Sequence, residues 1–202
     1  MFKVHYIYAT MNSGKTTRLL QNMFSYQQAG VKTYLLTPKI DTRNGVGTVE
    51  SRIGLKAKAD LVLGDTFTDE LAKLIDKAYI KDNIIMIDEA QFLKPELIYK
   101  IVEYCRDLDY AMPHDDEYFT LYAYGLLTDF TGHLFDGSKA WVEEADSMRK
   151  EDTKCFYCNR KATKNLLTSH NTDSNIQIGD SEYQPVCSYH YWYYTNTNTN
   201  KL

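Results

Sequence analysis

A glycine, a lysine and a threonine stand side by side in residues 9–16, which read ATMNSGKT. An apolar run over residues 4–9 precedes them and a helical pattern over residues 17–29 follows, so this segment turns a strand into a helix. In such a turn, the backbone N–H groups of residues 11–16 and the helix N-terminus attract phosphate oxygens. Lys15 would bridge the β- and γ-phosphates, and the Thr16 hydroxyl would bind Mg²⁺. The predicted nucleotide-binding positions of this segment are Ala9, Thr10, Met11, Asn12, Ser13, Gly14, Lys15 and Thr16.

The segment departs in one position from the P-loop pattern GxxxxGK[ST], because Ala9 stands where the first glycine belongs. The alternative is an ordinary strand–turn–helix in which Gly14 relieves a tight turn and Lys15 is solvated. A second motif favours the phosphate-binding interpretation.

That second motif is IIMIDE at residues 84–89, in which four apolar residues run into two adjacent carboxylates. A central parallel strand ends in this way at the edge of a sheet that carries a ligand. Asp88 would hold Mg²⁺ directly or through water. Because side chains alternate along a strand, Glu89 faces differently and is free for another task. The alternative is a solvated strand end, and the presence of the phosphate-binding segment argues against it.

Four residues near the C-terminus have the spacing of zinc ligands. Cys155 and Cys158 form CxxC, and Cys187 and His190 form CxxH. Three thiolates and one imidazole close a tetrahedral Zn²⁺ site with no open position, so the predicted zinc is structural. The alternative is an exposed His190 with free thiols. The long connector over residues 159–186 predicts a lid that covers a neighbouring site during phosphate transfer.

Strand and helix patterns alternate over the first three quarters of the chain. The further strands are expected at residues 31–37, 84–88 and 118–124, which predicts a doubly wound α/β unit with a mostly parallel sheet. Residues 111–117 read as a loop, and after residue 150 the segments become short. The predicted domains are residues 1–150, residues 151–194 with the metal ligands, and a disordered polar tail over residues 195–202.

Four helices are expected. The first has Leu19, Leu20, Met23 and Phe24 at helical spacing, and Gly30 suits its C-terminus. The second spans Asp69–Tyr79 with Thr68 as N-cap, and its inner stripe is Leu71, Leu74, Ile75 and Ala78. The third begins at Pro95 and has one apolar face, formed by Leu97, Ile98, Ile101, Val102 and Cys105. The fourth begins after Ser138 and carries Trp141, Val142, Ala145 and Met148 inward.

Composition is that of a soluble globular protein, with 44% hydrophobic and 25% charged residues and no apolar stretch long enough to span a bilayer. The N-terminus lacks a signal pattern, so a cytoplasmic protein without a membrane partner is expected. A net charge of −4 argues against non-specific binding to nucleic acid and favours a small substrate.

Seven blocks in order resemble the type II thymidine kinases, over nearly the whole chain except the Asn/Thr tail. They are ATMNSGKT at 9–16, KIDTR at 39–43, SRIGL at 51–55, IDEAQF at 87–92, YGLLTDFTGHLFDGSKA at 124–140, CFYCNRKAT at 155–163 and VCSYHY at 186–191. The resemblance implies transfer of the γ-phosphate of ATP to the 5′-hydroxyl of thymidine. It also implies a RecA-like P-loop domain, a small β-rich zinc domain with a lasso loop over thymidine, and a homotetramer inhibited by dTTP.

By the same resemblance, Glu89 is the general base, and Asp88 with Thr16 belongs to the Mg²⁺ site. Asp88, Glu89, Ala90 and Gln91 join the ATP-binding positions. The nucleoside pocket is formed by Met11, Gln91, Phe92 and Tyr183, while Asp41 and Arg43 lie close to phosphate and metal. The implied cofactors are ATP, Mg²⁺ and structural Zn²⁺.

The chain departs from the family pattern in two places. Leu127, Thr131 and His133 stand where relatives have Arg, Arg and Glu, and the lasso has Gly179 and Asp180 where two glycines are frequent. Two other functions remain open: an ATP-driven nucleic-acid-binding protein whose aromatic residues 189–194 stack bases, and a nucleotide-binding module without turnover.

Overall fold

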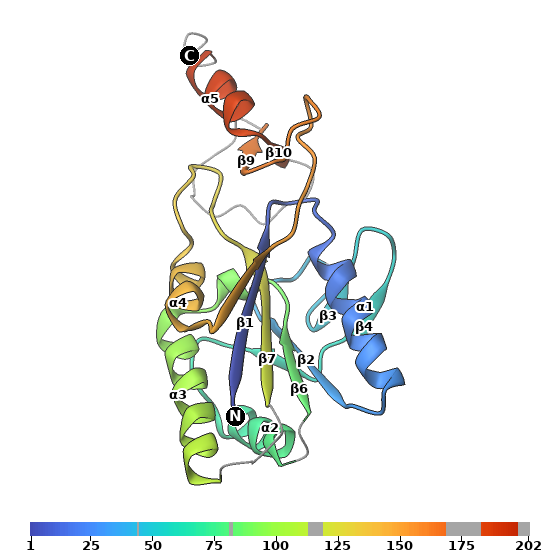
Figure 1. Ribbon diagram of the computed structural model, residues 1–202, viewed down its shortest axis with the longest axis vertical. Helices are drawn as coiled ribbons and strands as arrows, with labels where there is room; N and C mark the ends of the chain where they lie inside the picture. The colour runs from blue at the N-terminus through green and yellow to red at the C-terminus, as the bar shows by residue number, and fades with distance from the viewer. Residues whose placement is uncertain (44, 81–82, 113–118, 169–182, 198–202) are drawn as a thin grey trace.

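The computed structural model describes residues 1–43, 45–80, 83–112, 119–168 and 183–197. Within these ranges, a six-stranded sheet forms the centre of the molecule, with the strand order β5-β2-β6-β7-β1-β8 (Figure 1). Every pairing in it is parallel, which confirms the predicted sheet. The strands are β1 (Lys3–Ala9), β2 (Thr33–Pro38), β5 (Leu61–Leu63), β6 (Ile84–Ile87), β7 (Thr120–Leu126) and β8 (Ser147–Lys150).

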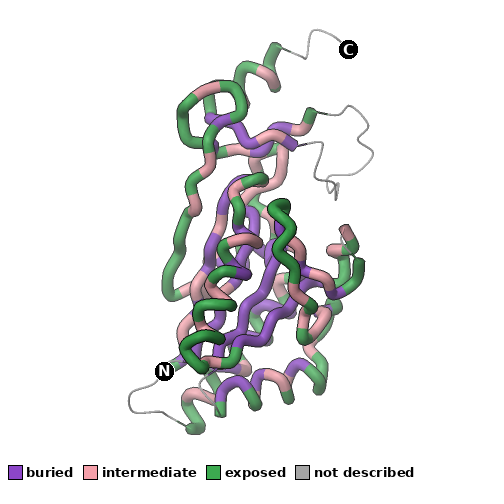
Figure 2. The backbone as a smooth tube through the Cα atoms, turned by 90° about the vertical axis from the view of Figure 1, so that its right-hand side faces the viewer, coloured by how far each residue is buried: buried purple, intermediate pink, exposed green. Residues whose placement is uncertain are grey.

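Helices cover both faces of the sheet, as an all-parallel sheet requires. α1 (Lys15–Gln28) lies on one face beside the hairpin of β3 (Thr48–Glu50) and β4 (Lys56–Lys58). On the other face lie α2 (Asp69–Tyr79), α3 (Pro95–Ala111) and α4 (Asp136–Glu144). The side chains of β1 point to opposite faces of the sheet. Val4 and Tyr6 pack on the side of α2, α3 and α4, whereas Ile7 packs with α1. Figure 2 shows the buried strands between these exposed outer helices.

Two helices match their predictions closely because their signals are local. α2 has the predicted bounds, and Thr68 Oγ1 accepts a hydrogen bond from Leu71 N at 3.3 Å. α3 begins at Pro95, and all five residues of its predicted apolar face are buried. At the end of α1, Gly30 has φ 80° and donates to Gln27 O, as expected of the residue that terminates a helix.

Two apolar residues of the predicted helical patterns are exposed, and one of them, Met148, was wrongly predicted to face inward. Phe24 is 61% exposed, because it lies past the edge of the stripe that Leu19, Leu20 and Met23 form on α1. Met148 is 44% exposed and belongs to β8, since α4 ends at Glu144 and the chain then pairs with β1. β8 was missed because all four of its residues are exposed, which leaves no apolar pattern.

The C-terminal unit, residues 151–168 and 183–197, lies beyond the carboxyl ends of β1 and β7 (Figure 1). It contains the antiparallel strands β9 (Lys164–Leu167) and β10 (Tyr183–Val186), followed by α5 (Ser188–Thr197). Residues 195–197 were expected in the disordered tail but belong to α5, in which the hydroxyls of Thr195 and Thr197 donate to Tyr191 O and Tyr193 O. Gly179, Asp180 and residues 198–202 lie outside the described residues, and the division of the chain at residue 151 stays a prediction.

Candidate active site

The turn between β1 and α1 contains two residues in a left-handed backbone conformation. Gly14, the N-cap of α1, has φ 81°, and Asn12 has φ 60°. Lys15 is 7% exposed and its Nζ donates to Thr10 O at 3.4 Å, so the alternative of a solvated lysine is wrong. The hydroxyl oxygens of Thr10 and Ser13 are buried without a hydrogen-bond partner among the described residues. Buried hydroxyls without partners are costly, and phosphate oxygens would satisfy them.

The two predicted Mg²⁺ ligands meet at this turn. Thr16 Oγ1 lies 3.1 Å from Asp88 Oδ2, at the carboxyl end of β6. Hydroxyl and carboxylate oxygens are the ligands that Mg²⁺ prefers, so these residues fit the ion. Burial, followed by the neighbouring charge of Glu89, raises the pKa of Asp88 to about 7. A bound cation reverses that effect, because it favours the ionised carboxylate.

Glu89 is held in an unusual backbone conformation. Its φ of 48° is left-handed, and it is the N-cap of the short helix η1 (Ala90–Phe92). For a residue other than glycine this conformation costs about 1–3 kcal/mol and occurs mostly at functional sites. The side chain is 7% exposed, its Oε1 accepts from Arg43 Nη2 at 2.7 Å, and its Oε2 accepts from Gln91 Nε2 at 2.6 Å. Both carboxylate oxygens are therefore fixed.

The pKa of Glu89 lies below its ordinary value. Burial raises this pKa, but the charges of Arg43 and Lys15, together with the two hydrogen bonds, outweigh burial. Lys15 also acts on the pKa of Asp88. The ammonium group and the two carboxylates thus belong to one electrostatic site, in which Glu89 is ionised.

Arg43 joins two of the predicted acidic residues. Its Nε donates to Asp41 Oδ1 at 2.8 Å and its Nη2 donates to Asp41 Oδ2 at 3.1 Å. The side chains of Arg43 and Asp41 are only 21% and 10% exposed. This pair is therefore part of the buried site and not an isolated surface contact on a loop.

Gln91 connects Glu89 to the sheet. It is 2% exposed, and its Oε1 accepts from Leu126 N at 3.0 Å while its Nε2 donates to Glu89. A Cβ atom at Gly125 would lie 2.8 Å from Gln91 Oε1, so this close approach needs glycine. Sequence analysis missed Gly125, although a glycine inside a strand is the signal of such an approach.

Gly137 and Trp141 of α4 contact the segment that contains η1. A Cβ atom at Gly137 would lie 2.5 Å from Gln91 O and from Leu93 O. Ala90 is fully buried, and its carbonyl accepts from Trp141 Nε1 at 3.1 Å. The segment that carries Glu89 and Gln91 is thereby held rigidly between β7 and α4.

The predicted nucleoside-pocket residues lie on three elements. Phe92, at the end of η1, packs edge-on against Phe135 with 5.9 Å between ring centroids. Tyr183, in β10, is 7% exposed, and its ring lies 6.3 Å from that of Phe130. Met11 N, in the turn after β1, donates to Asn165 Oδ1 at 2.8 Å.

The departures from the family pattern after β7 have a local explanation. Asp129 Oδ1 accepts hydrogen bonds from Thr131 N, Thr131 Oγ1 and His133 N, at 2.7–3.0 Å. The Asp129 carboxylate thereby closes a turn, to which Thr131 donates from both its backbone N–H and its hydroxyl. Leu127 is partly buried and packs against the hydrophobic core to which α2, α3 and α4 contribute.

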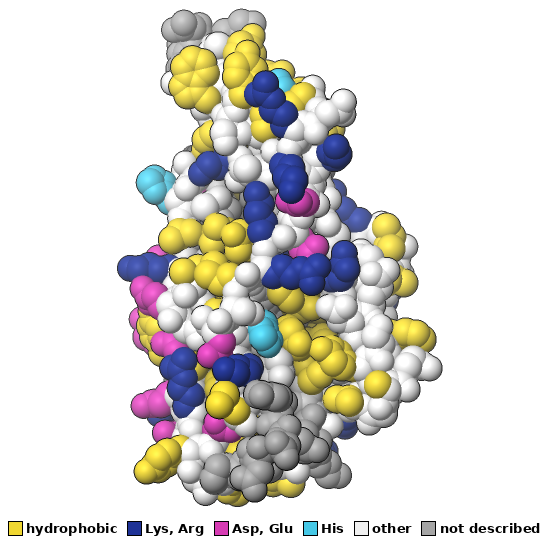
Figure 3. All heavy atoms as spheres, viewed as in Figure 1, with side chains coloured by type: hydrophobic (Ala, Val, Ile, Leu, Met, Phe, Trp, Pro, Cys, Tyr) yellow, Lys and Arg dark blue, Asp and Glu magenta, His cyan; other side chains and the backbone are white. Residues whose placement is uncertain are grey.

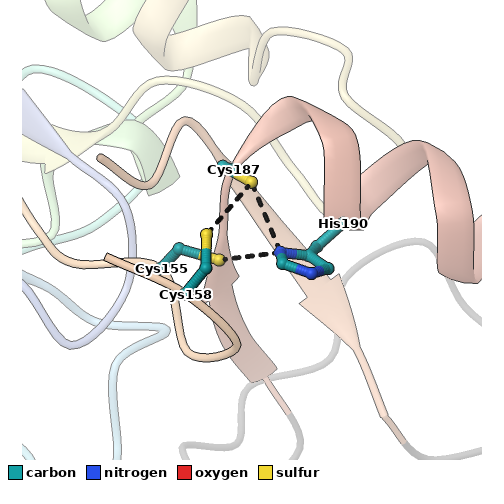
Figure 4. Close-up of side chains that lie close together, drawn as sticks. All are labelled: Cys155, Cys158, Cys187 and His190. Carbon is teal, nitrogen blue, oxygen red and sulfur yellow. Dashed lines mark hydrogen bonds between the residues drawn. The ribbon is translucent and has the colours of Figure 1, made fainter. Parts of the chain in front are cut away.

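The four predicted zinc ligands converge in the C-terminal unit (Figure 4). Their ligand atoms lie within 4.8 Å of one another. His190 Nδ1 is 3.3 Å from Cys155 Sγ and 3.4 Å from Cys187 Sγ, and Cys158 Sγ is 3.9 Å from Cys187 Sγ. A tetrahedral zinc with bonds of about 2.0–2.3 Å has edges of about 3.5–3.8 Å, which these separations approach.

Thiolate character at Cys155 also suits a metal. Burial raises the pKa of this thiol, but hydrogen bonds from the backbone of Cys187 and Tyr157 and from the His190 side chain lower it to about 6. The donor set of three sulfurs and one nitrogen fits Zn²⁺.

The surface around the segment after β8 carries charges of both signs. Figure 3 shows Lys and Arg side chains gathered there with acidic side chains among them, and Lys161 pairs with Asp152.

None of the helices within the described ranges is long and apolar enough to cross a membrane.

Comparisons with known proteins agree on one family. The family model described as "Thymidine kinase" matches residues 2–191. The thymidine kinase of Streptococcus gordonii is 39% identical over 198 residues, covering 95% of this chain and 97% of that protein. The thymidine kinase of Rhodopirellula baltica is 37% identical over 199 residues, covering 95% of this chain and 88% of that protein.

Among solved structures, the Pif1 helicase of Candida albicans is similar over 74% of this chain and 36% of the helicase. The TM-score is 0.38 at 16% sequence identity, a likeness too weak to bear on function.

Proposed function

The chain belongs to the thymidine kinase family, and we propose that it transfers the γ-phosphate of ATP to the 5′-hydroxyl of thymidine. One observation of the structure supports this most: Lys15, the Thr16–Asp88 pair and the Glu89 carboxylate share one buried site. A phosphate-binding turn, a cation site and an ionised acid are the parts that phosphoryl transfer requires.

The turn after β1 would hold the triphosphate. Its N–H groups, the α1 N-terminus and Lys15 neutralise phosphate charge, and the hydroxyls of Thr10 and Ser13 donate to phosphate oxygens. Thr16 and Asp88 would hold Mg²⁺, which stabilises negative charge on the transferring group when it is bound. Phosphoryl transfer leaves little covalent chemistry to the protein, so positioning and charge neutralisation carry the catalysis.

Glu89 would orient the nucleoside hydroxyl and accept its proton. The 5′-oxygen forms a bond to the γ-phosphorus, the bond from that phosphorus to the bridging oxygen breaks, and ADP leaves with the electron pair. Because the pKa of Glu89 is lowered, it is a weak base. It therefore accepts the proton late, after the new bond has formed. Arg43 and Gln91 keep its oxygens in place, and each oxygen retains a further lone pair.

The Cys155, Cys158, Cys187 and His190 cluster would bind one structural Zn²⁺. Four protein ligands fill a tetrahedral site, so a zinc ion there has no position for substrate. Its role would be to fold the C-terminal unit, which has a small core of Cys155, Leu166, Val186 and Cys187.

Three further properties rest on the family resemblance: we propose a homotetramer, feedback inhibition by dTTP and a cytoplasmic location. A fourth, the absence of a nucleic-acid partner, is proposed from the net charge of −4.

The test is incubation of the purified protein with ATP, Mg²⁺ and a panel of nucleosides. Formation of dTMP from thymidine supports the kinase. ATP hydrolysis that DNA stimulates, without dTMP, supports the nucleic-acid-binding alternative. Tight ATP binding without any product supports a module that has lost turnover.

A further inference from the structure

Asn165 is an unusual residue for its position. It lies inside β9 and is 3% exposed. Asparagine is depleted in strands, and a buried amide group is costly unless hydrogen bonds satisfy it. A buried strand asparagine therefore indicates specific partners.

Those partners lie outside the C-terminal unit. Asn165 Oδ1 accepts from Met11 N at 2.8 Å, and Asn165 Nδ2 donates to Thr128 O at 3.4 Å. An N–H can only donate and a carbonyl can only accept, so the two partners fix the orientation of the amide. One side chain thus joins β9 to the phosphate-binding turn and to the loop after β7.

The contact lies next to a bend in the turn. Met11 precedes Asn12, which has a left-handed backbone conformation that asparagine tolerates. On the far side, Gly14 and α1 anchor the chain. On the near side, the bond from Met11 N to Asn165 holds the backbone between the end of β1 and Asn12.

Asn165 lies in the hairpin that leads into one of the metal ligands. In the β9–β10 hairpin, Asn165 lies opposite Pro185, two residues before the ligand Cys187. A second contact holds the same unit to the loop after β7, since Tyr191 OH donates to Phe130 O at 2.6 Å. The position of the hairpin therefore decides whether the Asn165 amide reaches Met11.

We propose that Asn165 is a positioning residue: from the C-terminal unit, it preorganises the phosphate-binding turn. The proposal rests on the proposed function of residues 9–16 as the ATP site. Preorganisation raises affinity because a turn that is already ordered loses less entropy when nucleotide binds.

The test replaces Asn165 by leucine, which has a similar size but makes no hydrogen bond. Two quantities are measured on the zinc-loaded protein: hydrogen exchange of the Met11 amide without nucleotide, and the dissociation constant of a non-hydrolysable ATP analogue with Mg²⁺. In Asn165→Leu we expect exchange at Met11 to accelerate about tenfold or more. The dissociation constant should rise about tenfold, as loss of one buried hydrogen bond implies.

Kinetics separate positioning from a general loss of structure. The KM for ATP should rise about tenfold in Asn165→Leu, while the zinc content stays close to wild type. The KM for thymidine should rise less than the KM for ATP, because Asn165 contacts the predicted nucleoside pocket through the backbone of Met11, which belongs to the turn itself. Asn165→Asp keeps the accepting oxygen and should retain the protection of the Met11 amide. Thr163→Ala is the matched control, because Thr163 Oγ1 contacts Ser188 Oγ within the C-terminal unit. It should change neither exchange at Met11 nor nucleotide affinity.

Two results would overturn the proposal: unchanged exchange at Met11 in Asn165→Leu, or accelerated exchange with unchanged nucleotide affinity. If Asn165→Leu does not fold, Asn165→Ala undergoes the same measurements. If the wild-type protein binds no ATP analogue, the proposed function fails, and the exchange experiment still decides whether Asn165 holds the turn.

Discussion

Arg43 and Glu89 form an ion pair, with 2.7 Å between Arg43 Nη2 and Glu89 Oε1, and the same guanidinium group holds Asp41. Arg43 therefore sets both the position and the charge state of the acid that the proposed mechanism uses. Arginine suits this role because its planar group donates to two carboxylates in fixed directions.

Replacement of Arg43 by methionine should shift the pH dependence of turnover. Without the guanidinium charge, burial acts on Glu89 with less opposition and raises its pKa. The ionised form is the active one, so activity is lost as pH falls through this pKa. The acidic limb of kcat/KM for thymidine should therefore move to higher pH, by about one unit or more. A pH–rate profile of both proteins is the measurement, and coincident acidic limbs would contradict the assignment.

Replacement of Glu89 by glutamine should lower kcat roughly 10²-fold or more, the usual effect of losing a positioned base. Binding of an ATP analogue should change little, because the proposed contacts to the phosphates are made by the turn after β1 and not by the Glu89 side chain. Steady-state kinetics and calorimetry measure the two effects. Glu96→Gln, in the exposed first turn of α3, is the control for the same chemical change. Normal turnover of the Glu89 variant would remove this residue from the mechanism.

Replacement of Lys15 by alanine should weaken ATP binding and lower turnover together. A charge-assisted hydrogen bond contributes about 1.5–3 kcal/mol, which corresponds to a rise of roughly 10- to 100-fold in the dissociation constant. Lys77→Ala, on an exposed position of α2, should leave ATP affinity unchanged. Wild-type affinity in Lys15→Ala would mean that the turn does not bind phosphate.

The sequence was sufficient where signals are local. α2 has an N-cap threonine and an apolar stripe, and Ile84–Ile87 carries a continuous apolar run, so both were predicted near their observed bounds. β8 has no such run, and β5 has only three residues. Short strands of this kind form because a neighbouring strand already offers hydrogen-bond partners.

Contacts between distant residues explain what sequence analysis missed in the site. Asn165 and Met11 are 154 positions apart, and no local pattern connects an asparagine in β9 with the turn after β1. Gln91 was expected in the nucleoside pocket from the family resemblance, and that role stays a prediction. The sequence did not indicate that its amide contacts both Glu89 and Leu126. Only the folded sheet brings Leu126 beside η1.

The metal cluster leads to a prediction about zinc content. The wild-type protein should contain about one zinc per chain, in line with one four-ligand site. Cys187→Ser should lose most of it and unfold at lower temperature, because structural zinc contributes directly to folding. Cys105→Ala is the control, since Cys105 lies buried in α3 and outside the cluster. Elemental analysis and thermal denaturation measure both effects. Full zinc content in Cys187→Ser would exclude this cysteine as a ligand.

Asp88→Asn should stabilise the protein in magnesium-free buffer while it abolishes the Mg²⁺ site. The pKa of Asp88 is about 7 in the folded protein and about 3.9 in an unfolded chain. A raised pKa stabilises the folded state below pH 4, and this contribution is lost as pH rises toward 7. At pH 8 the buried wild-type carboxylate is charged and unfavourable, whereas asparagine is neutral. The Tm of Asp88→Asn should then exceed that of wild type by at least about 2–4 °C, the shift that 1 kcal/mol gives for a protein of this size. The difference should vanish near pH 4, and Mg²⁺ with ATP should stabilise only the wild type. Equal Tm values at pH 8 would show that the buried, charged Asp88 carboxylate does not destabilise the folded protein.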